Sequence, residues 1–173
     1  MKRALFLSTI LALACLARSQ GTVNFNNHST AVSAPVYDVN IPVSGPDVVA
    51  GLFYNGVQQG ASAPFRTGNG AGFWNAGADT TRVIDGVPGG QPATLDVRVW
   101  DSSKGATYDA AVAAGSLSGK SDPFTIILGG GGTPPSVPAD MIGFRSIAIL
   151  PEPSTIALFA LGGAGLAAVR RRK

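Results

Sequence analysis

This chain of 173 residues has few of the side chains that build reactive or metal-binding sites. It has one cysteine, Cys15, and one histidine, His28. A single thiol excludes a disulfide within the chain, and these two side chains alone cannot complete a transition-metal site. No Gly-x-Ser-x-Gly segment accompanies His28, so a Ser-His-Asp triad is not indicated. We therefore expect no catalytic residue, no metal and no cofactor, and a domain that folds without a disulfide.

Positive charge is also scarce outside the two ends of the chain. The formal net charge is +3, but seven of the thirteen cations lie at positions 2, 3, 18 and 170–173. The residues between 20 and 150 hold six cations and nine aspartates, a net charge of about −3. A protein that binds the phosphate backbone needs clustered basic side chains, which this region lacks. We expect no nucleic-acid partner.

The N-terminal segment is typical of a secretory signal peptide. Lys2 and Arg3 precede a short apolar stretch at residues 4–16, and Ala17 and Ser19 place small side chains at the −3 and −1 positions of a cleavage site before Gln20. As a helix, the apolar stretch rises only about 20 Å, which is too short to remain as a membrane anchor. A lipoprotein anchored through Cys15 is an alternative, although the residues before it form a poor lipobox.

The remaining sequence shows the alternation of β-strands. Apolar Leu95, Val97 and Val99 alternate with polar neighbours, and similar alternation occurs at residues 23–25 and 142–150. A period of two places one set of side chains on a buried face and the other toward solvent. We therefore predict an all-β domain, a small sandwich or jelly roll of about seven to nine short strands.

Turn-forming residues bound the other apolar runs. Residues 48–54 end at Asn55-Gly56, which predicts a two-residue hairpin, and residues 81–84 end at Asp85-Gly86. A strand over residues 124–128 is expected to end at four glycines. One segment, residues 108–114, is predicted as a short helix, with a glycine placed to end it.

Residues 129–138 combine four glycines with three prolines and have the composition of a linker. The run at residues 141–150 has the pattern of a further strand, so we interpret the segment as a long loop before the last strand. A domain boundary at this loop is the alternative.

The C-terminal tail has three parts: a Pro-Glu-Pro triplet, an uncharged apolar segment at residues 156–169, and a basic end. The triplet and the basic end consist of Pro151, Glu152, Pro153, Arg170, Arg171, Arg172 and Lys173. A helix over residues 154–169 would be about 24 Å long and could span a slightly thinned bilayer. The cations after it would hold the C-terminus on the cytoplasmic side, with the preceding domain outside.

This tail resembles the PEP-CTERM sorting signal, whose parts occur here in the same order. The resemblance covers residues 151–173. It implies recognition and processing by an exosortase, a membrane-embedded Cys protease-transpeptidase of Gram-negative bacteria that make exopolysaccharide. On this resemblance, Pro151, Glu152 and Pro153 are the recognition triplet. A plain tail anchor, in which the prolines only break the helix, is the alternative.

The Gly-rich segment at residues 67–75 is a candidate ligand site. Its aromatic residues, Phe73 and Trp74, could stack on sugar rings, or one ring could belong to the core. Trp100 is a second candidate for such stacking. Carboxylate pairs such as Asp96 with Asp101 are the only sequence feature that suggests hydrolysis.

These observations predict a signal peptide at residues 1–19, an extracytoplasmic β domain at 20–150 and a sorting tail at 151–173. We expect export by the Sec machinery, residence in the inner membrane with the domain outside, and then display at the cell surface or in the extracellular matrix. The leading hypothesis is a noncatalytic structural protein with exopolysaccharide as a candidate partner. A carbohydrate-binding module and an aspartate-based hydrolase are the alternatives.

Overall fold

A computed structural model describes residues 19–149 of the chain. The predicted signal peptide, the predicted membrane helix and the sorting triplet lie outside these residues. Within the described range, no helix has the length and apolar character needed to cross a bilayer. The fold that follows is therefore that of the central domain.

The described domain is built mainly of β-strands, as predicted, with one α-helix and one 3₁₀ turn. There are twelve strands between residues 19 and 149, more than the seven to nine expected, because six of them are only two residues long. Such short pairings have no periodicity that a sequence pattern can reveal. The strands are β1 (Gln20–Asn24), β2 (Tyr37–Asp38), β3 (Ile41–Pro42), β4 (Val48–Tyr54), β5 (Val57–Gln58), β6 (Ala63–Pro64), β7 (Thr81–Pro88), β8 (Pro92–Asp101), β9 (Ser118–Lys120), β10 (Phe124–Ile127), β11 (Ala139–Asp140) and β12 (Ala148–Ile149).

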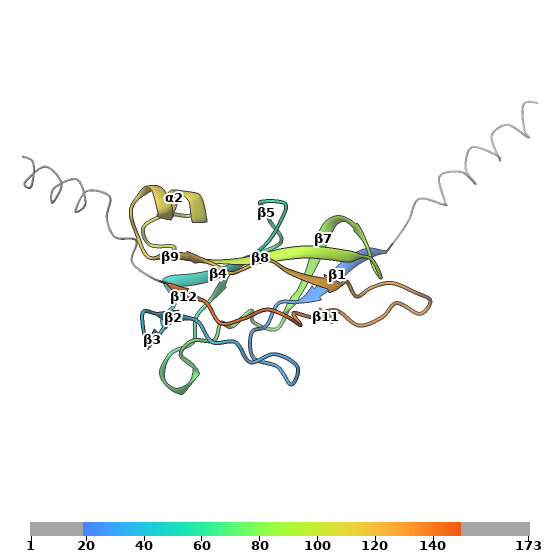
Figure 1. Ribbon diagram of the computed structural model, residues 1–173, viewed down its shortest axis with the longest axis horizontal. Coiled ribbons are helices and arrows are strands. Elements are labelled where there is room, and N and C mark those ends of the chain that lie inside the picture. Colours follow the sequence, from blue (N-terminus) through green and yellow to red (C-terminus); the bar gives the residue numbers. More distant parts are fainter. Residues whose placement is uncertain (1–18, 150–173) are drawn as a thin grey trace, which may run out of the picture.

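The largest sheet has β8 and β4 at its centre, paired antiparallel over seven residues. β10 and β9 pair with the other edge of β8, and β5 and β6 pair with β4. The predicted alternation holds along β8, where Leu95, Val97 and Val99 are buried. Figure 1 shows these strands running along the length of the domain, with β1 and β7 at one end and β12, β2 and β3 at the other.

The β4–β5 hairpin forms at Asn55-Gly56, where the sequence predicts it. Both residues have positive φ, 49° and 80°. Glycine and asparagine are the residues that tolerate this region best, which explains why the chain turns here in two residues.

The second sheet has the order β11-β1-β7 and corrects one prediction. Asp85-Gly86 does not end a strand, because β7 continues through it to Pro88. The register against β1 shifts between Gln20 and Gly21, so the dipeptide lies in a bulge. The buried side chain of Gln59 accepts a hydrogen bond of 2.9 Å from the Asp85 N–H and so satisfies a backbone donor that the bulge leaves unpaired.

The third sheet is small, with the order β12-β2-β3, and corrects the expected strand at residues 141–150. Only Ala148–Ile149 is extended in a ladder, where β12 runs parallel to β2. Met141, Phe144, Ile147 and Ile149 are the buried residues of this run, while Ile142 is exposed. Burial therefore does not alternate, because a turn follows Met141.

The Gly-rich segment at residues 129–138 packs against the domain, in agreement with its interpretation as a loop. Gly129 exchanges two backbone hydrogen bonds with Thr22, and the Ser19 hydroxyl donates to the Gly130 carbonyl. A β-carbon on Gly129 or Gly131 would overlap neighbouring backbone. The glycines thus allow close backbone contact, a structural use that their composition does not reveal.

The predicted helix forms as α2 (Tyr108–Ala113). The Thr107 hydroxyl accepts a hydrogen bond of 3.3 Å from the Ala110 N–H, and Gly115 follows the helix with φ of 65°. A threonine N-cap and a glycine after the last turn are strong end signals, so a helix of six residues could be placed from sequence.

Candidate functional site

The predicted sorting residues, Pro151, Glu152, Pro153, Arg170, Arg171, Arg172 and Lys173, lie outside the described residues. The structure does fix the point from which the chain continues toward them. The Ile147 carbonyl accepts a hydrogen bond of 2.8 Å from the Tyr37 N–H, and the Ile149 carbonyl accepts one of 3.0 Å from the Val39 N–H. The side chains of Ile147 and Ile149 are buried. The last described residue is therefore held beside the β2–β3 hairpin.

Trp74, one of the two candidate glycan contacts, lies in the core, which is the alternative that the sequence left open for one of the two rings. Its side chain is 1% exposed. The indole Nε1 donates a hydrogen bond of 3.1 Å to the Phe25 carbonyl, and the two rings stack with centroids 4.8 Å apart. Asn27, also buried, accepts from the Trp74 N–H at 3.1 Å. An indole enclosed and hydrogen-bonded in this way has no face free for a sugar.

Trp100 is buried to the same extent and is likewise unavailable for stacking on a ligand. Its ring contacts Tyr108 edge to face, with centroids 6.4 Å apart. Helix α2, which begins at Tyr108, covers this part of the central sheet. Both tryptophans are therefore structural.

Phe73, the other candidate glycan contact, is half-buried and lies against His28 on the surface. The ring centroids are 4.6 Å apart and the planes are inclined by 43°. The structure thus separates the two aromatic neighbours, one in the core and one at the surface. Contact between Phe73 and a glycan stays a prediction.

The aspartates considered for hydrolysis are used by local structure. Asp96 forms ion pairs with Arg98 at 2.9 Å and Lys120 at 3.6 Å. Asp101 accepts hydrogen bonds from the hydroxyl and N–H of Ser103, and the hydroxyl bond holds the pKa of Asp101 below its ordinary value. Asp96 and Asp101 both lie on β8, about 17 Å apart at strand spacing, which is too far for a glycosidase pair.

Arg82 illustrates how a buried charge is accommodated in this domain. Its guanidinium donates to the carbonyls of Ala61, Asp79 and Thr81 at 3.1–3.2 Å and lies 5.3 Å from the Phe25 ring centroid. Burial lowers the pKa of Arg82, and the Asp79 charge opposes that shift. The backbone carbonyls thus accept hydrogen bonds from a buried cationic side chain, which links the loop before β7 to the core.

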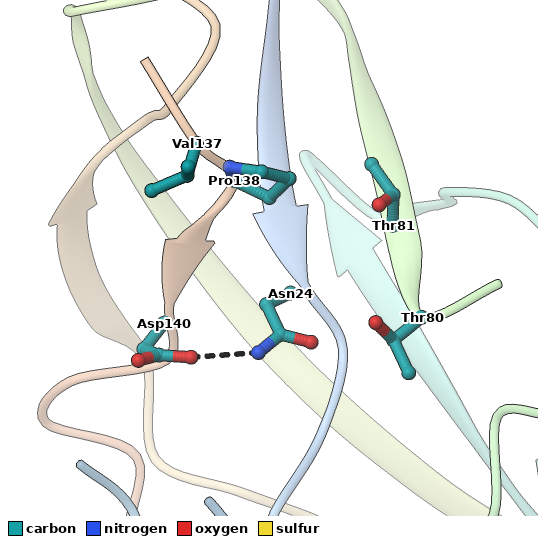
Figure 2. A pocket seen from close by; sticks show the side chains of 6 residues that line it. All are labelled: Asn24, Thr80, Thr81, Val137, Pro138 and Asp140. Carbon is teal, nitrogen blue, oxygen red and sulfur yellow. Dashed lines mark hydrogen bonds between the residues drawn. The ribbon is translucent and has the colours of Figure 1, made fainter. Parts of the chain in front are cut away.

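A polar pocket of about 410 Å³ lies at the end of the β11-β1-β7 sheet (Figure 2). Asn24 pairs with both Asp140 and Thr81 in the strand register, so three segments meet in one row. The Asn24 Nδ2 donates a hydrogen bond of 2.7 Å to Asp140 Oδ1. Among residues 19–149, no group hydrogen-bonds to the buried Oδ1 of Asn24. The pocket is lined by Asn24, Thr80, Thr81, Val137, Pro138 and Asp140.

No local sequence signal points to this pocket. Its residues are ordinary strand-end and loop residues from three segments that are more than fifty positions apart in the sequence, and no motif connects them. Within the described residues, no group of three or more His, Cys, Asp or Glu side chains comes together as a metal site. The pocket is lined instead by one carboxylate, two hydroxyls and the Asn24 amide that donates to the carboxylate. The carboxylate and the hydroxyls can exchange hydrogen bonds with a neutral polar ligand.

The similarity to known proteins lies in the tail rather than in the domain. The family model of the PEP-CTERM protein-sorting motif matches residues 150–173, which include the Pro-Glu-Pro triplet and the basic end. Neither the curated proteins nor the solved structures contain a match to the chain. The motif implies exosortase-dependent sorting to the cell surface and processing by that membrane enzyme. The chain therefore carries a PEP-CTERM protein-sorting motif at its C-terminal end.

Proposed function

We propose that this protein is a noncatalytic structural protein of the cell surface or extracellular matrix, delivered by its PEP-CTERM tail. The observation that carries the proposal is the direct connection of a sorting motif at residues 150–173 to a folded β domain that is described up to Ile149. Export through the Sec machinery, a Gram-negative host and association with exopolysaccharide belong to the same proposal. The N-terminal segment and the tail favour one topology, with the domain outside the cytoplasm.

The use of buried polar side chains supports a structural role for the domain. Asn27 donates to the carbonyls of Ala34 and Gly72, and Ser121 accepts from the Val97 N–H at 3.0 Å. Gln59 and Arg82 likewise bond to backbone groups of other segments. These four side chains hold loops and strands together, a use that favours a rigid scaffold.

The predicted sandwich is part of this proposal. One core cluster includes Val23 of β1, Leu52 of β4, Val97 of β8 and Ile149 of β12. All three sheets therefore contribute to one apolar interior, as expected for sheets that pack face to face.

The test of the sorting role is Glu152→Ala, with Ser154→Ala as the matched control beside the triplet. Because Glu152 precedes the apolar segment, its loss leaves the hydrophobicity of that segment unchanged. A recognition motif should not tolerate the change, so precursor should accumulate in the membrane while the control is processed normally. Intact mass spectrometry in a host that carries the sorting enzyme measures both products.

Identical masses for wild type and Glu152→Ala, with the four C-terminal cations retained in both, would favour a permanent tail anchor. Loss of the tail from both forms would show processing that does not read Glu152. The expected result is a mature wild-type chain without residues 170–173 and a Glu152→Ala chain that keeps them.

Carbohydrate binding is a second candidate function, and the pocket beside Asn24 is the observation that favours it. The Asp140 carboxylate and the Thr80 and Thr81 hydroxyls match the hydrogen-bonding groups of a sugar, and Asn24 holds the carboxylate in place. Binding of glycan fragments that is lost in Asn24→Ala and kept in Thr125→Ala, an exposed threonine on β10, would support this function. Equal binding by both variants would exclude the pocket.

A further inference from the structure

The β2–β3 hairpin has a tip that combines exposed apolar side chains with an unusual backbone. Val39 and Ile41 are 49% and 73% exposed. Val39 also has φ of 56°, in the left-handed region that a β-branched residue rarely occupies. Because strained backbone tends to cluster at functional positions, this tip is a candidate functional surface.

The tip lies beside the point where the chain continues toward the sorting motif. The Val39 N–H donates to the carbonyl of Ile149, and only Leu150 separates Ile149 from Pro151. A fully extended chain covers at most about 3.6 Å per residue, so Pro153 lies within roughly 14 Å of Ile149. In Figure 1, β12 and the β2–β3 hairpin lie together at the end of the domain opposite β1.

An enzyme that binds the triplet would therefore lie next to this end of the domain. A typical interface buries about 800 Å² on each partner, equivalent to a disc of roughly 16 Å radius. Pro151 lies within about 7 Å of Ile149, so a disc of this radius centred on Pro151 reaches Ile149 and the Val39 backbone that is hydrogen-bonded to it. The apolar side chains of Val39 and Ile41 would then be removed from water by the same contact that holds the motif.

We propose that the β2–β3 hairpin tip, Val39 and Ile41, is a second contact surface for the membrane enzyme that processes the tail. The proposal rests on the proposed sorting function and adds to it a determinant in the folded domain. The partner presents a complementary apolar surface next to its binding site for the triplet. The strained Val39 holds its branched side chain at the tip, where asparagine or glycine would satisfy the backbone but offer no apolar contact.

The experiment measures the rate at which full-length precursor becomes mature protein in a pulse-chase with the enzyme present. The variants are Ile41→Ser and Val39→Asn, and the matched control is Val57→Ser. Val57 is 62% exposed and begins the second strand of the β4–β5 hairpin, as Ile41 does in the β2–β3 hairpin. Burial of one aliphatic side chain corresponds to about a tenfold change in binding. We expect about tenfold slower processing for each tip variant and a wild-type rate for the control.

Two further measurements separate direct contact from unfolding and from a general defect in processing. The melting temperature of Val39→Asn should equal or exceed that of wild type, because asparagine tolerates the left-handed conformation; slow processing then does not reflect unfolding. A ten-residue Gly-Ser insertion after Leu150 should abolish the difference between Ile41→Ser and its parent, because a long tether separates the tip from the bound motif.

Equal processing rates for both tip variants, the control and wild type would overturn the proposal. A defect that is present in membranes and absent with detergent-solubilised enzyme would also overturn it, because the lipid surface would then be the partner of the tip. If wild type and Glu152→Ala are both never processed, the sorting function itself fails. Slow processing of the tip variants together with normal processing of wild type would support both the sorting function and the contact at the hairpin tip.

Discussion

The domain contains two hairpins with two-residue turns whose sequences differ sharply. The β4–β5 hairpin turns at Asn55-Gly56, while the β2–β3 hairpin turns at Val39-Asn40. Both have positive φ at the first turn residue, 49° at Asn55 and 56° at Val39. Asparagine accepts this conformation readily and valine does not. The first turn is therefore stabilised by its own residues, and the second must be held by its surroundings.

The surroundings of Val39 are visible in the third sheet. Strand β12 runs parallel to β2, and the Val39 N–H bonds to Ile149, whose side chain is buried. A residue more than one hundred positions away thus helps to hold the turn. The same local shape can therefore arise from local preference or from a distant strand, and substitutions can distinguish the two origins.

The largest loss of stability is expected from a substitution in β12, the strand that supports the β2–β3 hairpin. Ile149→Ala removes a buried side chain from the core and should lower the free energy of unfolding by about 2–5 kcal/mol. Val57→Ala changes an exposed side chain in the other hairpin and should stay within about 0.5 kcal/mol of wild type. Urea denaturation of the purified chain measures both, and similar losses would contradict a hairpin held from outside.

Placing valine in the β4–β5 turn, whose own residues favour the turn conformation, should also destabilise the fold. Asn55→Val puts a β-branched residue at φ of 49° in an exposed turn. We expect a loss of about 1–2 kcal/mol in the free energy of unfolding. Asn55→Gly serves as the control and should cost less than about 0.5 kcal/mol, since glycine adopts this region freely.

The reverse substitution, at the β2–β3 turn, should change the free energy of unfolding in the opposite direction and by a smaller amount. Val39→Asn relieves the left-handed valine, and we expect a gain of up to about 1 kcal/mol in the free energy of unfolding. The gain is limited because the half-exposed valine side chain gives up some packing. A melting temperature below that of wild type would mean that Val39 is stabilised by contacts stronger than its strain.

The smallest expected effect is on the pH dependence of stability. It arises at the start of β4, the end of that strand farther from the β4–β5 hairpin. Val48 of β4 pairs with Asp101 of β8, and the Ser103 hydroxyl keeps the pKa of Asp101 below its ordinary value. Because the folded pKa is depressed, this contribution is fully present above the unfolded pKa of about 3.9 and is lost as pH falls through the folded pKa. Ser103→Ala should reduce the fall in urea midpoint between pH 5 and pH 2, and an unchanged acid profile would contradict this assignment.

Parts of the fold followed from the sequence because their causes lie within a few residues. The Asn55-Gly56 turn, the alternation along β8 and the helix between Thr107 and Gly115 are set by backbone preference, periodicity and capping. The PEP-CTERM motif is equally local, since its triplet, apolar segment and basic end are consecutive. Such features can be read in one dimension because no distant residue is needed to define them.

Tertiary structure decided what depends on distant segments. Trp74 could have been exposed on its Gly-rich loop, but Phe25 and Asn27, almost fifty positions away, enclose it and take up its hydrogen-bonding groups. Asp85-Gly86 has the sequence of a turn, yet pairing with β1 and the Gln59 side chain makes it a bulge. The pocket exists only because Asn24, Thr81 and Asp140 meet in one register. Burial and pairing are properties of two or more segments together, so a pattern within one segment cannot determine them.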